Sequence, residues 1–174
     1  DNDVEEQALQ VELSYFNGKK EGPHKYFKSD GQLDKIGIYR GGKEHGRWNL
    51  YRDNGQLKSI ENYNNGLKDG PQYFYHSNGQ VARKEPYKDG NKDGLHQYYH
   101  SNGQLKAQLK FKNGKTSTGE MINYFDNGQI DSKGSYSEGI KEEGVWEYYN
   151  YNGGLNRKEC YVNDKSVAMS YCET

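Results

Sequence analysis

A short motif, Asn-Gly-Gln-Leu or a close variant of it, recurs along the chain and constrains the fold more than any other feature. Its glycine returns at steps of 24 or 25 residues, as Gly31, Gly55, Gly79, Gly103, Gly128 and Gly153. A fixed period of this length is typical of repeat proteins, in which each unit packs mainly against its two neighbours. We therefore expect the 174 residues to form one array of six units.

Two further rows of residues keep the same period. In the first row, an aromatic residue is followed three positions later by a glycine, as in Tyr39 and Gly42 or Phe111 and Gly114. In the second row, a glycine that we call the middle glycine is followed five positions later by an aromatic residue. The middle glycines are Gly22, Gly46, Gly70, Gly94, Gly119 and Gly144, and the aromatic residues are Phe27, Tyr51, Tyr75, Tyr99, Tyr124 and Tyr149.

Each unit thus contains two short stretches rich in aromatic and β-branched residues, separated by turn signals. Asn-Gly favours tight hairpin turns because glycine accepts a positive φ, and the stretches are too short for helices. The sequence predicts an all-β protein with almost no helix. Its fold would be an elongated, twisted, open antiparallel β-meander of six tandem hairpin repeats of about 24 residues, roughly 60 Å long at ~4.8 Å per strand.

We expect residues 1–174 to form a single repeat domain with different ends. Residues 1–8 would be an N-terminal cap, residues 9–159 would hold the repeats, and residues 160–174 would form a C-terminal cap hairpin that has lost the repeat's glycines. This cap holds the two cysteines of the chain, Cys160 and Cys172. A disulfide between them would indicate a periplasmic or otherwise extracytoplasmic protein, whereas two free thiols would suit the cytoplasm. We favour the disulfide.

The composition narrows the choice of partner. The 24 basic residues are interleaved with 25 acidic ones, so the chain lacks the clustered positive charge that nucleic-acid binding requires. The same even spread makes a membrane partner unlikely, and no apolar run approaches the ~18 residues of a membrane span. The 17 Tyr and 2 Trp replace missing aliphatic residues and predict a thin core with wet polar tips.

The segment from Tyr39 to Tyr51, with Gly42, Gly46 and Trp48, resembles the MORN repeat, and the added Asn-Gly-Gln-Leu turn resembles its bacterial variant. The resemblance covers about residues 9–165. It implies an open antiparallel sheet that binds partners rather than catalysing a reaction. Bacterial members of the family include antitoxin and immunity components, and other members are scaffolds or membrane-associated modules.

A comparison of equivalent positions in the six units separates residues that the fold requires from residues that could bind a partner. A residue that the fold requires must recur in every unit, whereas a residue that contacts a partner can differ between units. The recurrent aromatic residues are therefore assigned to the fold. The second and fourth positions after the middle glycine vary and carry the candidate partner-binding residues. These are Trp48, Leu50, Phe74, His96, Tyr98, Trp146 and Tyr148. They are either an exposed stripe of interface residues or the packed inner side of a curved sheet.

Signals for catalysis are poor, and we expect no enzyme, no cofactor and no metal. The chain has no His-Glu-x-x-His or paired Cys-x-x-Cys pattern, and its glycines precede no helix that could hold a phosphate. An acid pair at Glu142 and Glu143 is the one arrangement that could suggest a sugar hydrolase, but adjacent acids in a turn are usually solvated.

These observations lead to one main hypothesis. The protein is expected to be a non-enzymatic protein-binding repeat protein, an immunity or antitoxin protein that binds and neutralises a cognate bacterial toxin or effector. The alternative is a structural or membrane-surface scaffold built on the same repeats.

Overall fold

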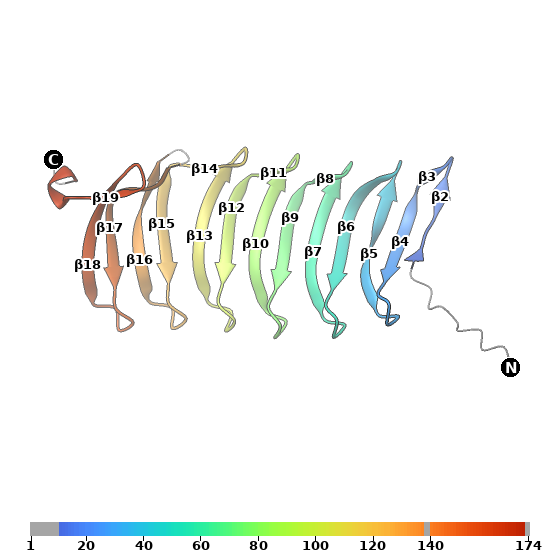
Figure 1. The fold of residues 1–174 in the computed structure, drawn as a ribbon, viewed down its shortest axis with the longest axis horizontal. Coiled ribbons are helices and arrows are strands. Elements are labelled where there is room, and N and C mark those ends of the chain that lie inside the picture. Colours follow the sequence, from blue (N-terminus) through green and yellow to red (C-terminus); the bar gives the residue numbers. More distant parts are fainter. Residues whose placement is uncertain (1–10, 138–139, 173–174) are drawn as a thin grey trace.

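The computed structural model describes residues 11–137 and 140–172, and it shows one long open ribbon of antiparallel strands (Figure 1). Its first half contains β1 (Val11–Glu12), β2 (Tyr15–Phe16), β3 (Lys19–Lys20), β4 (Gly22–Phe27), β5 (Leu33–Arg40), β6 (Lys43–Tyr51), β7 (Leu57–Asn64), β8 (Leu67–Lys68), β9 (Gly70–Tyr75) and β10 (Val81–Lys88). Its second half contains β11 (Asn91–Lys92), β12 (Gly94–Tyr99), β13 (Leu105–Lys112), β14 (Lys115–Thr116), β15 (Gly119–Tyr124), β16 (Ile130–Ser137), β17 (Ile140–Tyr149), β18 (Leu155–Val162) and β19 (Lys165–Val167).

The described residues contain a single short helix, the 3-10 turn Met169–Tyr171, and no helix that is long and apolar enough to cross a bilayer. Within these residues the predicted all-β meander is confirmed. From β4 to β18, each strand of six or more residues pairs in antiparallel fashion with the next such strand, as β6 does with β7 and β10 with β12.

The turns form where the glycines predict them. In the turn before β7, the Gly55 N–H donates to the Arg52 carbonyl at 3.0 Å, and Gly55 has a φ of 76°. At the opposite edge of the ribbon, Asn65 and Gly66 both have positive φ, at 50° and 83°. Two consecutive positive φ values match the right-handed twist of a hairpin, which is why Asn-Gly recurs there.

Hydrogen bonds also join each hairpin to the next one. At one edge, the N–H groups of Gly66, Gly90 and Gly114 each donate at 2.8 Å to a carbonyl of the preceding repeat. At the other edge, the Asn127 amide donates to the Tyr151 carbonyl at 2.8 Å, and equivalent asparagines do the same one and two repeats earlier.

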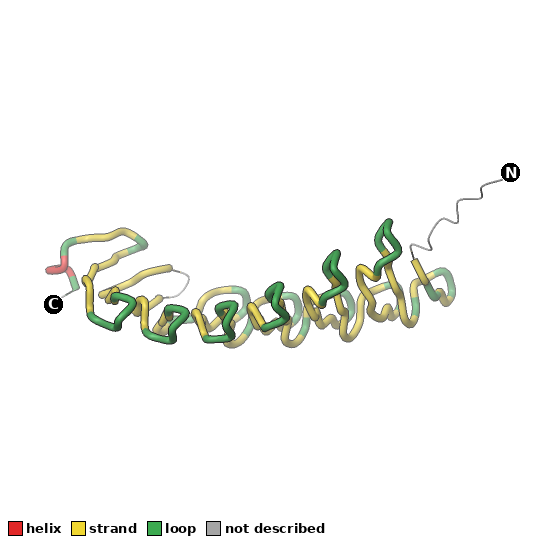
Figure 2. The backbone as a smooth tube through the Cα atoms, turned by 90° about the horizontal axis from the view of Figure 1, so that it is seen from below, coloured by secondary structure: helices red, strands yellow, loops and turns green. Residues whose placement is uncertain are grey.

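These side-chain and turn ladders bear on the shape of the sheet. The strands at the two ends of the ribbon run in nearly the same direction in Figure 1, and the ribbon bends gently in Figure 2. The twist of the ribbon is therefore gentle. Ladders that repeat at every unit favour such a flat sheet, because they hold equivalent residues in line.

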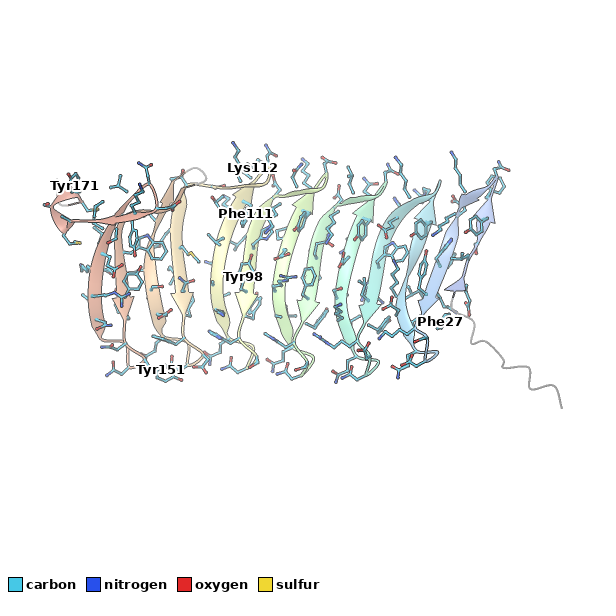
Figure 3. The ribbon with its side chains drawn as sticks, viewed as in Figure 1. Phe27, Tyr98, Phe111, Lys112, Tyr151 and Tyr171 are labelled. Atoms are coloured by element: carbon cyan, nitrogen blue, oxygen red, sulfur yellow. A yellow bond between two sulfur atoms is a disulfide. The ribbon has the colours of Figure 1, made fainter. Side chains whose placement is uncertain are left out.

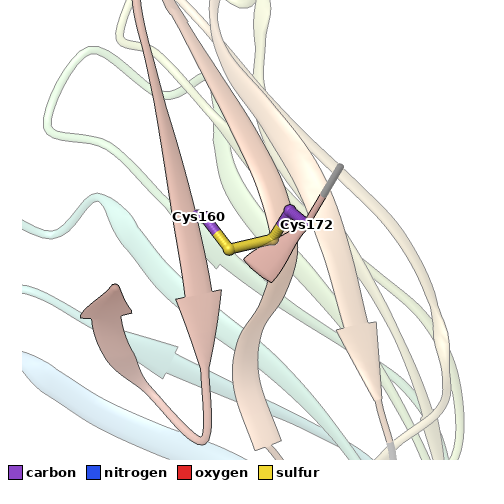
Figure 4. The surroundings of a disulfide bond; sticks show 2 residues. All are labelled: Cys160 and Cys172. Atoms are coloured by element: carbon purple, nitrogen blue, oxygen red, sulfur yellow. A yellow bond between two sulfur atoms is a disulfide. The ribbon is translucent and has the colours of Figure 1, made fainter. Parts of the chain in front are cut away.

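The two ends of the array differ from its middle. At the N-terminal end, β1 pairs with β4, and β2 pairs with β3 in a separate two-stranded sheet. The predicted cap at residues 1–8 lies outside the described residues. At the C-terminal end, β18 and β19 form a hairpin, and a disulfide joins Cys160 to Cys172 (Figure 4). The predicted disulfide is thus present, and it fastens the 3-10 turn against the last full strand.

Candidate binding surfaces

The ribbon has two faces, because successive side chains of a strand point to opposite sides and directly paired residues share a side. One face carries the second and fourth positions after each middle glycine, and we call it the variable face. The other carries the aromatic residues found five positions after the middle glycines, and we call it the tyrosine face. Figure 3 shows Phe27 of the tyrosine face close to the Asn-Gly turns and Tyr98 of the variable face nearer the middle of the strands.

Trp48 is the largest of the fully buried side chains on the variable face, with 1% of its surface exposed. Its indole lies over Gly37 of the neighbouring strand, where an added Cβ would come within 2.0 Å of Trp48 Cδ2. The Tyr39 ring packs edge-on against it at 5.1 Å between centroids. Trp146, at 3% exposed, lies over Gly134 in the same way. Each tryptophan is therefore accommodated by a glycine on the strand before it.

The other members of this position are also buried. His96 is fully buried between the rings of Tyr87 and Phe111, and its Nε2 lies 3.0 Å from the Pro86 carbonyl. Burial lowers the pKa of His96, although the nearby carbonyl opposes that shift. Gln72 is fully buried as well.

Gln72 occupies the corresponding position one unit earlier and bonds the backbone of the preceding strand and of its own strand. Its amide donates to the Asn62 and Gly70 carbonyls at 3.0 and 3.1 Å, and its carbonyl accepts from the Asn62 N–H at 3.0 Å. These polar side chains therefore stabilise the sheet through hydrogen bonds to its backbone. The idea that Trp48, His96 and Trp146 form an exposed stripe is wrong, because each of them fills space between strands.

The remaining candidates are half-buried and lie in one continuous row across the ribbon. Directly paired residues make up this row, in the order Tyr26, Lys35, Leu50, Ser59, Phe74, Arg83, Tyr98, Ala107, Asn123, Ser132, Tyr148 and Arg157. Four of the predicted residues are in it, namely Leu50, Phe74, Tyr98 and Tyr148. Every second place of the row holds a small or cationic group, and the places between them hold rings, except for Leu50 and Asn123. A comparison of equivalent positions alone could not show this, because the small and cationic groups come from the intervening strands.

Cations stack on the rings of this row. The Arg83 guanidinium lies 3.8 Å from the centroid of Phe74, and Arg157 lies 4.1 Å from the centroid of Tyr148. Each arginine also faces a carboxylate, since Arg83 Nε is 3.8 Å from Glu85 and Arg157 Nε is 2.7 Å from Glu159. The guanidinium groups are thereby held over the rings, while the side chains of Arg83 and Arg157 stay 44% and 53% exposed.

Tyrosine hydroxyls support the carboxylates. Tyr161 donates to Glu159 and lies 3.2 Å from the Tyr148 hydroxyl. The hydrogen bond from Tyr161, followed by the one from Arg157, lowers the pKa of Glu159. In the second unit, hydrogen bonds from Tyr63 and Lys68 outweigh the cost of burial and lower the pKa of Glu61. Both acids are therefore ionised at neutral pH, and Glu159 keeps Arg157 of the row in place.

Two histidines near the Asn-Gly turns join neighbouring repeats. His76 Nε2 lies 2.9 Å from the Tyr99 carbonyl, and His100 Nε2 lies 2.7 Å from the Tyr124 carbonyl, so each joins two repeats. Among the described residues, no group of three or more His, Cys, Asp or Glu could hold a metal ion. The side chains of Glu142 and Glu143 lie outside the described residues.

The sequence profile of the MORN repeat variant family matches residues 44–65, 68–89, 92–113, 117–138 and 142–163. These five matches fall on five successive hairpins and together span more than half of the chain. The chain belongs to the MORN repeat variant family. Each MORN match runs from the start of one hairpin to the turn that ends it, and the hairpin before Glu44 repeats the pattern without being part of a match. No curated protein matches this MORN chain. MORN repeats suggest a role in binding or as a scaffold.

Proposed function

We propose that this protein binds a partner protein through its variable face and is an immunity or antitoxin protein that neutralises a cognate toxin or effector. The supporting observation is the row of half-buried rings and stacked arginines around Phe74, Arg83 and Tyr98. Tyrosine, tryptophan and arginine are the residues that contribute most to protein interfaces. In this proposal the protein is not an enzyme and needs neither a cofactor nor nucleic acid.

The size of the ribbon is compatible with such a complex. A stable interface takes ~800 Å² from each partner, and the whole surface measures 10949 Å². An interface over three or four hairpins would therefore leave most of the molecule free. The disulfide at the C-terminal cap supports a periplasmic or otherwise extracytoplasmic location, because such bonds persist in oxidising compartments.

The test is binding to the toxin encoded beside this protein, measured by calorimetry. Substitution of Phe74, Arg83 and Tyr98 by alanine, singly, should weaken binding by about tenfold or more at the central positions. Tyr151, which is 55% exposed and lies in a turn away from the row, provides the matched control. If the three variants bind as tightly as the parent, the partner does not use the variable face.

A loss of toxin neutralisation in the same variants would connect binding to function. Tight binding that leaves the toxin active would instead favour a scaffold. A hydrolytic activity of the purified protein on the toxin would contradict the proposal.

A further inference from the structure

The tyrosine face carries a second row of rings that the proposed function does not use. Each ring is directly paired with an aliphatic residue at the start of the next strand, as Tyr75 is with Val81 and Tyr99 with Leu105. All six aromatic residues of this row are half-buried rather than enclosed. A single sheet covers only one side of such rings, so the row remains accessible along the described part of the ribbon.

Hollows lie beside this row. One has a volume of about 690 Å³ and lies between Tyr73, Val81, Lys84 and Tyr99 and the two neighbouring Asn-Gly turns. An equivalent hollow lies two units later, where Ile130 and Tyr149 meet the turn residues Gln129 and Asn152. The same pairing of an aliphatic side chain, a tyrosine ring and amide-bearing turn residues thus recurs.

The rings lie along the strands rather than standing away from them. Tyr149 donates through its hydroxyl to Glu147 on the same face at 2.6 Å, and Asn49 approaches the Tyr51 hydroxyl at 3.5 Å. These two hydroxyls thus reach the residue two positions earlier on their strand. The long axis of each of the two rings therefore follows the strand, and an apolar group can pack on the ring.

The spacing of the rings selects the shape of a linear ligand. Equivalent residues two strands apart are separated by ~9.6 Å. A polyproline II chain has three residues per turn and a rise of ~3.1 Å, so every third side chain points the same way at ~9.3 Å intervals. The difference of ~0.3 Å per repeat stays below ~1 Å over four rings.

Two other backbone shapes fit less well. In an extended strand, residues three apart point to opposite sides, so they cannot contact the same row. In an α-helix, seven residues span ~10.5 Å, and the mismatch with the ring spacing reaches ~2.7 Å over the same four rings.

The polar groups of the row suit the same ligand. A polyproline II chain makes no internal hydrogen bonds and leaves its carbonyls available. The amides of Gln80 and Gln104 line the first of these hollows and can act as donors to them. We propose that the tyrosine face is a docking site for a proline-rich segment with proline at every third position, bound across the strands. This site lies on the opposite face from the toxin-binding row and does not depend on it.

The test uses a fluorescein-labelled 15-residue peptide with proline at every third position, titrated with the full chain and followed by anisotropy. We expect saturable binding that weakens about tenfold in Tyr99→Ala and in Tyr124→Ala. Tyr99→Phe should retain binding, because Phe27 occupies the same position in the first unit and the hydroxyl is not needed for packing. Tyr148→Ala, on the variable face, should leave peptide binding unchanged while weakening the toxin complex.

The controls separate this proposal from its rivals. A peptide with proline at every fourth position, equal in length and composition, should bind several-fold more weakly because it loses register with the rings. Equal affinity for the two peptides would overturn the proposal, as would absence of saturable binding. The proposal would also be overturned if an unbranched glucan oligomer bound in place of the peptide and lost affinity in Tyr99→Ala.

Discussion

Replacing Gly37 by alanine should destabilise the N-terminal half of the ribbon. The new Cβ would lie 2.0 Å from Trp48 Cδ2 and 2.2 Å from Trp48 Cε2. Carbon atoms in contact prefer ~3.5–4.0 Å, so the indole must move by roughly 1.5 Å or more. Because Trp48 is 1% exposed and Tyr39 packs against it, there is little room for that movement.

The expected cost depends on how far the ring moves. Overpacking of this kind costs about 1–3 kcal/mol, and complete loss of a buried tryptophan would cost about 3–5 kcal/mol. In a chain of this size, each kcal/mol lowers the melting temperature by roughly 2–4 °C. We therefore expect Gly37→Ala to lower the midpoint in far-UV circular dichroism and to shift the tryptophan emission to longer wavelength.

Gly119→Ala is the matched control. Gly119 also lies in a strand, has no positive φ, and has no atom within 4 Å of the position that a Cβ would take. Its replacement should change the melting temperature by much less than Gly37→Ala. The second comparison is the double variant Gly37→Ala with Trp48→Gln, which places at residue 48 the side chain found at Gln72. Removing the ring should make Gly37→Ala nearly harmless in that background.

The reasoning would be refuted by either of two results. One is a Gly37→Ala protein that melts with the parent, and the other is a double variant that loses the sum of the two single effects. The first would mean that the indole is not confined, and the second that the two positions do not interact.

Three further predictions follow from the cap and the titrating groups. Cys160→Ser should loosen the last hairpin, because a loop of this length contributes about 3 kcal/mol in the chain-entropy account, and hydrogen exchange at β18 and β19 would measure it. Burial lowers the pKa of His96, so below about pH 6.5 the unfolded chain takes up a proton that the folded chain does not, and the folded state loses stability. Replacing His96 by glutamine, the residue found at the equivalent position 72, should reduce this loss. Urea midpoints at pH 8 and 5.5 that shift equally in parent and variant would contradict this. Hydrogen bonding to Lys158 lowers the pKa of Glu147 to about 2, so its stabilising effect is lost as the pH falls from about 4.5, and Glu147→Gln should flatten the acid limb of a stability–pH curve.

The repeat and the turns could be predicted from the sequence because they depend on local rules. Positive φ at Gly55 and Gly66 follows from the turn type, and the period of 24 or 25 residues fixes which residues share a face. The pairing of Cys160 with Cys172 followed from their place in one small cap.

Local rules of this kind could not predict which side chains of the variable face are buried. Whether Trp48 is exposed depends on Gly37, which belongs to the preceding strand and to none of the three glycine rows. Gly37 and Gly134 occupy the same unit position, where other units have Glu61, Glu85, Leu109 and Glu159. A comparison of each large residue with its cross-strand neighbour would have detected the match. The stacking of Arg83 on Phe74 was not predicted for the same reason, because the two residues lie on neighbouring strands.

The ladders between hairpins make the length of this molecule adjustable. Asn78, Asn102 and Asn127 each bond the turn that follows one repeat later, and the turn glycines of the other edge bond the repeat before. A cut between Tyr75 and His76 rejoined between Tyr99 and His100 would bring equivalent residues together without a change of register. Gain or loss of one such segment by recombination would lengthen or shorten the ribbon by two strands while leaving every remaining turn with a neighbour to bond. The reach of its surfaces can thus evolve independently of the chemistry that each hairpin presents.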